Sequence, residues 1–237
     1  MIAFREIEDD DPILALSPLV RALDFLRCEF GANDKGILLT ATMALKPNLI
    51  ARAVTEIEWP DWMEKDVYRR IKVAREEHYD PLWVLHYELI NLRFARHYRR
   101  RLALTRAGRP VIESRFRSFH FLTKHLMLGS WRFQFGRDRL MGNWDIWLNV
   151  LNVEAEDGVT GKYLTHVLYG PPDQASPFDE RASYLYDGVL KPLVWSGLLT
   201  ESIPEVRLLS ERTYSKTPLW ERYLNLDDKP SRNVVRH

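Results

Sequence analysis

Along most of the chain, apolar residues recur at steps of three and four, the spacing of one face of an α-helix. Residues 12–30 show the pattern first, with Leu19 and Leu23 on the same face. Ser17 followed by Pro18 suits the start of this helix, because a hydroxyl caps the first turn and proline is tolerated at its first position. The same spacing predicts further helices over residues 47–58, 66–77, 80–94, 110–122 and 181–197, and a last one from 218.

A few short stretches instead alternate or concentrate apolar residues in the manner of β-strands. Residues 37–40 and the alternation of Leu102 with Leu104 predict two strands, and residues 207–214 a third. Residues 170–177 are rich in proline and predict a loop, and the tail from residue 227 is expected to fray. The fold class expected from this pattern is mainly α with small β-hairpins.

A weak internal repetition runs through the chain: three times a leucine-rich helix is followed by a short strand, a threonine and another helix. The threonines are Thr40, Thr105 and Thr217. Their spacings are irregular, which excludes a strict solenoid and favours two or three modules packed together. The expected division is 1–60, an N-terminal module; 61–128, a central basic module; 129–157, an aromatic linker; and 158–237, a C-terminal module.

Composition narrows the class of protein. Apolar residues make up 46% of the 237 and charged residues 28%, which suits a globular protein with a real core. Cys28 is the only cysteine, so no intramolecular disulfide forms, and a reducing compartment fits. The sequence shows neither a signal-peptide pattern nor about 20 uninterrupted apolar residues. We therefore expect a cytoplasmic protein that does not engage a membrane.

The net charge of +1 hides an uneven distribution. Residues 93–139 hold thirteen Lys/Arg and only two acids, a balance of +11, whereas the remainder carries −10. Guanidinium groups pair bidentately with phosphates and carboxylates, so such a stretch typically meets a polyanion or an acidic protein surface. The candidate binding residues are Arg93, Arg96, Arg99, Arg100, Arg101, Arg106, Arg109, Arg115 and Arg117.

A competing interpretation is that these arginines face the molecule's own carboxylates. The acidic N-terminus, residues 6–11, is one segment that would fold back over them. Aromatic residues such as Phe94 and Tyr98 alternate with the arginines, and exposed ones would stack on bases, while most of them are expected in the core. Charge counting alone leaves both interpretations open.

Residues 102–109, Leu-Ala-Leu-Thr-Arg-Ala-Gly-Arg, resemble the stretch that follows the wing in many winged-helix proteins. There a β-hairpin returns to a leucine-threonine step, then two variable residues, a glycine and a base. The resemblance implies that residues 80–94 occupy the recognition-helix position and that residues 94–104 form the wing.

Residues 35–125 also resemble an uncharacterised family of plasmid and insertion-element passenger proteins, the ORF-three-like family. The shared features are Leu38-Leu39-Thr40 with a following Lys46, and a second leucine-threonine step at Leu104-Thr105. The first copy lacks the glycine of the second, having Met43 or Ala44 near that place. This resemblance implies a fold and carries no biochemistry.

Three functions follow as hypotheses. The first is non-catalytic nucleic-acid binding, regulatory in kind, in a bacterial, plasmid or phage system, with duplex DNA gripped by a basic wing and helix face. The second is a protein-interaction adaptor or inhibitor whose arginine-rich face binds an acidic partner. The third is a helical ribonuclease in which His120 acts as general base and Arg115 stabilises the phosphorane. A homodimer is compatible with all three.

The sequence gives no positive sign of a metal or cofactor. The seven histidines lack an HExxH pattern and paired cysteines, and His120 and His125 fall on different faces of one helix. A glycine-rich phosphate loop is absent from the sequence. We expect no metal, no cofactor and no catalytic residue.

Overall fold

The computed structural model describes residues 2–33, 35–69, 71–172, 179–204 and 208–226. The chain forms two compact units: residues 9–122 make up the N-terminal unit, and residues 1–8 together with 123–237 make up the C-terminal unit. The expected frayed tail, most of the predicted loop (173–177) and the first residue of the strand expected at 207–214 lie outside the described residues.

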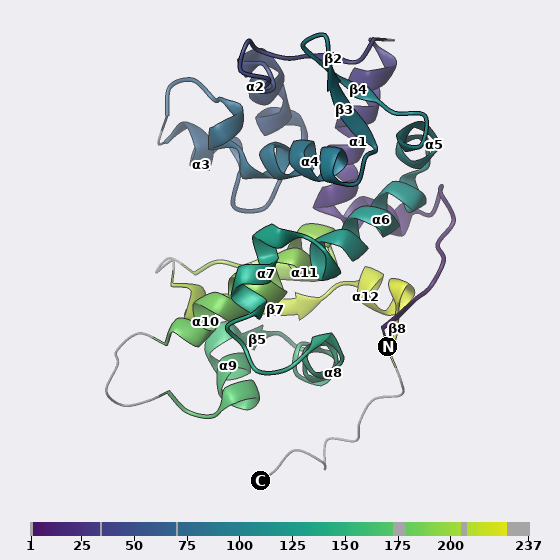
Figure 1. The fold of residues 1–237 in the computed structure, drawn as a ribbon. Helices are drawn as coiled ribbons and strands as arrows, with labels where there is room; N and C mark the ends of the chain where they lie inside the picture. The colour runs from purple at the N-terminus through teal and green to yellow at the C-terminus, as the bar shows by residue number, and fades with distance from the viewer. Residues whose placement is uncertain (1, 34, 70, 173–178, 205–207, 227–237) are drawn as a thin grey trace. The chain divides into compact units, whose positions relative to one another are not determined.

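The N-terminal unit is mainly helical and contains one small sheet (Figure 1). Its helices are the 3₁₀ helix η1 (Pro12–Leu16), α1 (Pro18–Gly31), α2 (Pro47–Glu56), α3 (Glu64–Tyr68), the 3₁₀ helix η2 (Glu76–His78), α4 (Asp80–Asn91), α5 (Gly108–Glu113) and the first part of α6 (Arg115–Leu128). Its strands are β2 (Ile37–Leu38), β3 (Ala95–Tyr98) and β4 (Arg101–Leu104).

The sheet of this unit is antiparallel, with β4 between β2 and β3. Ile37 pairs with Leu102 on one side of β4, and Ala95 pairs with Leu104 on the other. The elements follow in the order α1, β2, α2, α3, α4, β3, β4, and β4, the third strand, lies in the middle of the sheet. We call the β3–β4 hairpin the wing of this unit.

The core of this unit follows from the helical periodicity of the sequence. Ser17 caps α1 by accepting a hydrogen bond from Val20 N, and Pro18 occupies the first helical position. Burial removes from water the apolar faces of α1, α2 and α4 and the inward residues of the sheet. They include Leu19, Leu23, Leu26, Leu49, Ile50, Ala53, Leu82, Leu85, Leu89, Ile37 and Leu102.

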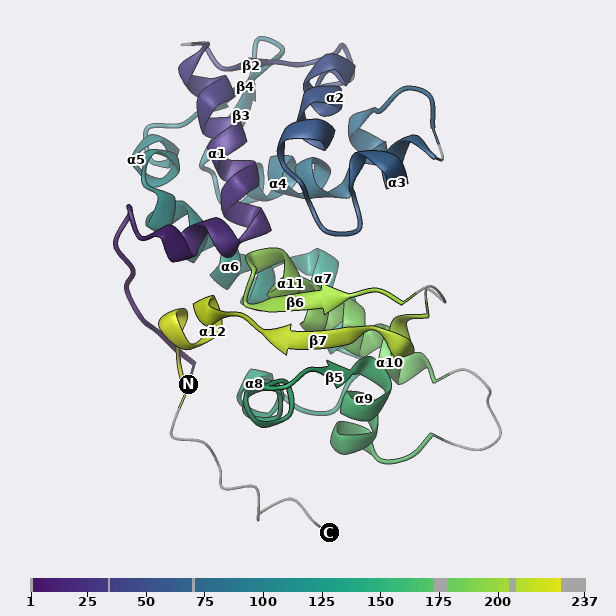
Figure 2. The same cartoon turned by 180° about the vertical axis from the view of Figure 1, so that it is seen from behind.

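The C-terminal unit repeats the arrangement. Its helices are the second part of α6, α7 (Trp131–Arg137), α8 (Trp144–Glu154), α9 (Gly161–Tyr169), α10 (Glu180–Leu185), the π-helical η3 (Tyr186–Leu190), α11 (Lys191–Ser196), the 3₁₀ helix η4 (Leu209–Glu211) and α12 (Pro218–Tyr223). Its strands are β5 (Val159–Thr160), β6 (Leu199–Ser202) and β7 (Thr213–Lys216), with β1 (Ala3–Phe4) and β8 (Leu224–Asn225) paired separately. Figure 2 shows β7 between β5 and β6, the same strand order as in the N-terminal unit, and we call the β6–β7 hairpin the wing of this unit.

One threonine closes each unit in the same way. The hydroxyl of Thr105, just after β4, donates to the carbonyls of Arg93 and Phe94 at 2.7 and 3.3 Å. The hydroxyl of Thr217, just after β7, donates to the carbonyls of Gly197 and Leu198 at 2.6 and 3.3 Å. Each bond ties the end of the third strand to the residues that leave the preceding helix. The threonine that recurs after a short strand in the sequence therefore has a structural cause at two of its three positions, Thr105 and Thr217.

The glycine of the winged-helix resemblance has an equally direct cause. A Cβ atom at Gly108 would lie 1.9 Å from the carbonyl oxygen of Phe94. Gly108 N donates to the hydroxyl of Thr105 at 2.9 Å. Any larger residue at this position would therefore force apart the start of α5 and the chain entering β3.

Several elements differ from the sequence-based expectation. The expected boundary near residue 60 falls inside one unit, because β2 before it pairs with β4 after it. Residues 129–157, expected as a linker, contain α7 and α8: the Phe133 ring packs against Trp195 at 5.7 Å, and Gly136 closely approaches Gly188. The helix expected over 66–77 ends at Tyr68, and Ser114 separates α5 from α6. Among the described residues, no helix is long and apolar enough to cross a bilayer.

Candidate nucleic-acid interface

The wing of the N-terminal unit is a tight hairpin with two arginines at its tip. Tyr98 pairs with Arg101, so only Arg99 and Arg100 form the turn. Both have positive φ, 48° and 57°, as a two-residue hairpin turn of this type requires. Glycine and asparagine are the residues that adopt this conformation readily, and an L-residue with a side chain is strained there. The tip of the wing therefore holds two arginines at positions that backbone energetics alone would give to glycine.

The charge of this unit is concentrated at the wing and the segment after it. Residues 9–92 carry ten bases and fifteen acids, whereas residues 93–122 carry nine arginines and one acid, Glu113. Seven of these arginines are exposed and make no ion pair with any described residue. They are Arg93, Arg96, Arg99, Arg100, Arg106, Arg109 and Arg117. Most of the predicted binding residues thus present guanidinium groups that the described part of the protein does not neutralise.

Tyr98 lies between two of these arginines. The guanidinium carbons of Arg96 and Arg99 are 5.3 and 5.2 Å from the centre of its ring, and the ring itself is 48% exposed. The cation–π contacts hold both side chains against the wing and leave their N–H groups available to an acceptor. Arg101, the remaining arginine of the hairpin, donates to the carbonyl of Gly36 at 2.8 Å and is only partly exposed.

Helix α4, which the winged-helix resemblance places in the recognition-helix position, contains no Lys or Arg. Most of its residues are buried, and its main exposed side chain is Tyr87, whose ring lies 5.0 Å from that of Trp83. Residues 80–91 therefore supply no basic helix face beside the wing. Arg93 follows the helix, and the sequence periodicity of leucines already required most of α4 for the core.

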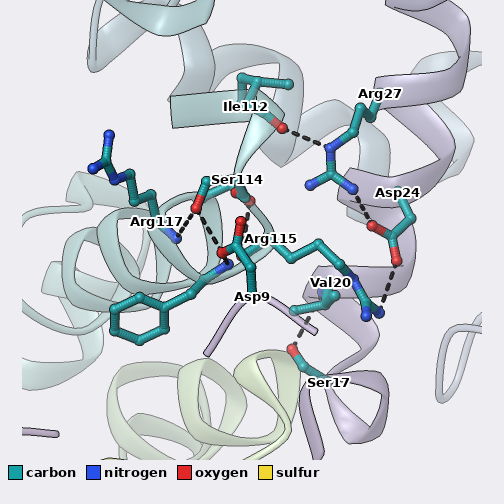
Figure 3. Close-up of polar contacts among 11 residues, drawn as sticks. Asp9, Ser17, Val20, Asp24, Arg27, Ile112, Ser114, Arg115 and Arg117 are labelled. Carbon is teal, nitrogen blue, oxygen red and sulfur yellow. Dashed lines mark hydrogen bonds and ion pairs between the residues drawn. The ribbon is translucent and has the colours of Figure 1, made fainter. Parts of the chain in front are cut away.

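Arg115 and Arg117 lie at the start of α6, where they differ in environment (Figure 3). The Arg115 guanidinium pairs with Asp24 on α1 at 3.1 Å, and Asp24 also pairs with Arg27. The Arg117 side chain is exposed, and only its backbone N–H is engaged, by the hydroxyl of Ser114 at 3.0 Å. Arg115 is thus held by the fold, whereas Arg117 is available.

The acidic N-terminal segment contacts this region through Asp9, as Figure 3 shows. Its carboxylate accepts hydrogen bonds from the Ser114 hydroxyl at 2.7 Å and from Phe116 N at 2.9 Å. Burial alone would raise the pKa of Asp9, but the bonds from Ser114 and from the backbone N–H groups of Phe116 and Arg115 outweigh it and lower the pKa. Asp9 therefore caps α6 and does not mask a wing arginine.

Arg115 and His120, the two residues of the ribonuclease hypothesis, lie in different surroundings. Arg115 is engaged by Asp24, while the His120 ring packs against Phe116 at 5.6 Å and Phe121 at 5.8 Å. No contact between Arg115 and His120 appears among the described residues. In that part of the chain, no three His, Cys, Asp or Glu residues lie close enough together to hold a metal ion.

Sequence reasoning missed a polar chain that leads from the core to the wing. The Glu76 carboxylate contacts His86 Nδ1 at 2.5 Å, and His86 Nε2 contacts His97 Nε2 on β3 at 2.9 Å. Glu76 and His86 are 4% and 3% exposed, whereas His97 is exposed. Residues 76, 86 and 97 show no motif spacing, so only the fold brings them together. The one usable signal was a histidine on the apolar face of a predicted helix.

The wing of the C-terminal unit has a different chemistry. Arg212 pairs with the buried Glu201 at 3.0 Å, and Tyr214 donates its hydroxyl to the same carboxylate at 3.0 Å. Lys216 pairs with Glu156 and donates to the carbonyl of Asn152 at 3.0 Å. The described cations of this wing are therefore all engaged by the unit itself.

Comparisons with known proteins agree with the division into two units. Residues 15–117 match the family model of the y4jL N-terminal domain, and residues 134–218 match that of the y4jL C-terminal domain. No solved structure matches the chain. The chain is 26% identical over 196 residues to the uncharacterised protein y4jL of Sinorhizobium fredii, an alignment that covers 78% of this chain and 89% of that protein, so its similarity to y4jL extends over both units.

Proposed function

We propose that the protein is a non-catalytic nucleic-acid-binding protein that grips the phosphates of duplex DNA with the wing of the N-terminal unit. The observation that carries the proposal is the set of seven exposed arginines without an ion pair in the described chain, on and beside the wing. Arginine forks match phosphate geometry, and phosphate contacts supply most of the affinity of sequence-independent DNA binding.

The proposed recognition is of the phosphate backbone, with no reading of bases by α4. Base readout needs polar or basic side chains that reach the groove. Helix α4 exposes Tyr87 and part of Trp83 instead. A regulatory role in a bacterial cytoplasm completes the proposal, supported by the similarity to a Sinorhizobium fredii protein and by the single cysteine.

Two observations favour a second candidate, a protein-interaction adaptor with an acidic partner. The overall charge is only +1, whereas dedicated duplex binders usually have a clearly basic balance. The aromatic pair Trp83 and Tyr87 also gives α4 a surface better suited to a protein than to DNA. In this candidate the wing arginines grip carboxylates.

The test is the salt dependence of binding to a fluorescent duplex of about 20 base pairs. About five phosphate contacts give a slope near −4 to −5 for log K against log[salt]. The double variant Arg99→Gly/Arg100→Gly removes two cations and suits the turn, so it should lower the slope by about 2 and weaken binding roughly 60-fold at 0.1 M salt.

A matched control removes two cations of the same unit away from the wing. Lys65→Ala/Lys72→Ala should leave the slope and the affinity within about twofold of the parent, because neither residue belongs to the wing. Equal losses in both double variants would show a diffuse charge effect. Absence of duplex binding at about 50 mM salt would contradict the proposal and favour the adaptor.

A further inference from the structure

The contact between His86 and His97 is a hydrogen bond between rings that meet head-on. Their Nε2 atoms are 2.9 Å apart while the ring centroids are 5.1 Å apart, so both nitrogens lie between the rings and face each other. A metal ion with bonds of about 2.0–2.1 Å to each nitrogen does not fit between atoms arranged in this way. One proton must therefore occupy the contact.

Counting hydrogens along the chain defines its states. Glu76 accepts with both oxygens, from Leu45 N at 2.7 Å and from His86 Nδ1 at 2.5 Å, so His86 Nδ1 carries a hydrogen. With two neutral rings, His97 Nε2–H donates to His86 Nε2, and His97 Nδ1 is left as an acceptor. A further proton makes His97 Nδ1 a donor and changes the charge of the three groups from −1 to 0.

We propose that Glu76, His86 and His97 form a proton relay that makes His97 a pH-dependent phosphate contact of the wing. The proposal rests on the proposed function and adds to it a residue and a form of regulation. His97 lies on β3 between Arg96 and Tyr98, and its Nδ1 makes no hydrogen bond to a described residue. The buried pair of Glu76 and His86 fixes the ring, so only the protonation state of Nδ1 changes.

The other charged groups of the elements around His97 are engaged elsewhere. The elements that pack on one another here are η2, α4, β3 and β4. On η2, Glu77 pairs with Arg75 and His78. On α4, Asp80 lies in the first turn and Glu88 accepts a hydrogen bond from Asn91. On the hairpin, Arg101 donates to the carbonyl of Gly36, and Arg96 lies over the Tyr98 ring. The groups that act on His97 electrostatically are His86 and Glu76.

The direction of the pH effect follows from linkage. Burial and the charge of His86 lower the pKa of His97, and Glu76 offsets part of this effect. A bound phosphate favours the protonated ring and raises that pKa, so binding takes up a proton and becomes tighter as the pH falls. Each unit by which phosphate raises the pKa makes binding about tenfold tighter at low pH.

The experiment measures duplex affinity of the full-length protein from pH 5.5 to 7.5 at constant ionic strength. The parent should bind about tenfold more tightly at pH 5.5 than at 7.5, and His97→Gln should lose this gain. His78→Gln removes another histidine of the same unit, at the edge of η2, and should keep it. An undiminished pH dependence in His97→Gln would overturn the proposal while leaving the proposed function intact.

A second measurement follows the imidazole of His97 directly by NMR. Addition of duplex at low salt should raise its titration midpoint by about one pH unit, whereas His78 should move little. A midpoint that stays fixed while duplex binds would also overturn the relay. Absence of duplex binding at every pH would instead contradict the proposed function itself, and the relay with it.

Discussion

The two units share one topology and use arginine in opposite ways. The first wing, residues 95–104, contains four arginines and no acid, whereas residues 199–216 of the second contain three bases and three acids. In the first wing Arg96, Arg99 and Arg100 are exposed and without ion pairs in the described chain. In the second, the Arg212 side chain is 11% exposed and pairs with the side chain of Glu201, which is 3% exposed.

Arg212 in the second wing contributes to the stability of the fold, whereas the fold gives no such role to the exposed arginines of the first wing. Glu201 is a buried carboxylate that also accepts from Tyr214, and an unpaired charge in that place would be costly. Burial is the main cause that raises the pKa of Tyr214, and the negative charge of Glu201 raises it further. The Tyr214 hydroxyl therefore keeps its proton and donates a hydrogen bond to that carboxylate. Arg212 is thus accounted for by stability, while the first wing gains no comparable contact from its arginines. Binding is the role that we propose for them.

The largest expected effect is the loss of stability when Arg212 of the second wing is replaced. Replacing Arg212 by Met keeps much of the volume but removes the guanidinium that pairs with the buried Glu201 side chain, which should cost about 3 kcal/mol of unfolding free energy. The same change at the exposed Arg99 should alter stability by less than about 0.5 kcal/mol. Urea denaturation followed by circular dichroism measures both.

The double variant Arg212→Met/Glu201→Gln serves as the control for this pair. Removing both charges should recover part of the loss, because the penalty comes from a buried carboxylate that has lost its guanidinium partner. Equal stability losses at Arg212 and Arg99 would show that the two wings do not differ in this way.

A smaller effect tests what the units have in common. Thr217→Val and Thr105→Val each remove a hydroxyl that donates to two carbonyls and accepts one backbone N–H, from Leu219 and Gly108 respectively. The loss should be about 1–2 kcal/mol at the buried Thr217 and about 1 kcal/mol at the partly exposed Thr105. Ser variants, which keep the hydroxyl, should recover most of it. A Val variant as stable as the parent would contradict the shared closing role.

Much of the architecture could be predicted from local signals. The 3.6-residue period located α1, α2 and α4, and Ser17 with Pro18 fixed the start of α1. The leucine-threonine step located β4, and the hairpin expected over residues 94–104 is confirmed by β3 and β4. The helices and β4 are encoded by neighbouring residues, so local sequence signals reveal them, whereas the hairpin was expected from the winged-helix resemblance.

Features that depend on distant contacts could not be predicted. The aromatic residues of 129–143 gave no sign that Phe133 meets Trp195, and the range therefore looked like a linker. Residues 76, 86 and 97 meet only because η2, α4 and β3 pack on one another.

The smallest expected effect on stability concerns the residue with positive φ that follows the helix before each wing. Arg93 follows α4 with a φ of 59°, and Gly197 follows α11 with a φ of 78°. Both helices end with the same pair of backbone hydrogen bonds. In the first unit Phe94 N donates to Leu89 O and Arg93 N to Ile90 O, and in the second Leu198 N donates to Leu193 O and Gly197 N to Val194 O. Glycine is the residue that suits this helix end, so the first unit tolerates strain to keep an arginine.

The two positions should therefore respond in opposite directions. Arg93→Gly should raise the unfolding free energy by about 0.5–1 kcal/mol, and Gly197→Ala should lower it by about 1 kcal/mol. Arg93→Ala keeps the strain but loses the charge, so both Arg93 variants should weaken duplex binding equally, roughly eightfold at 0.1 M salt if Arg93 contacts one phosphate. Denaturation and fluorescence anisotropy on the same preparations test this trade of stability for binding. If Arg93→Gly is more stable and binds as tightly as the parent, the strain at this helix end serves no phosphate contact. The proposed phosphate contacts would then lie at the tip of the wing, at Arg99 and Arg100, and not at Arg93.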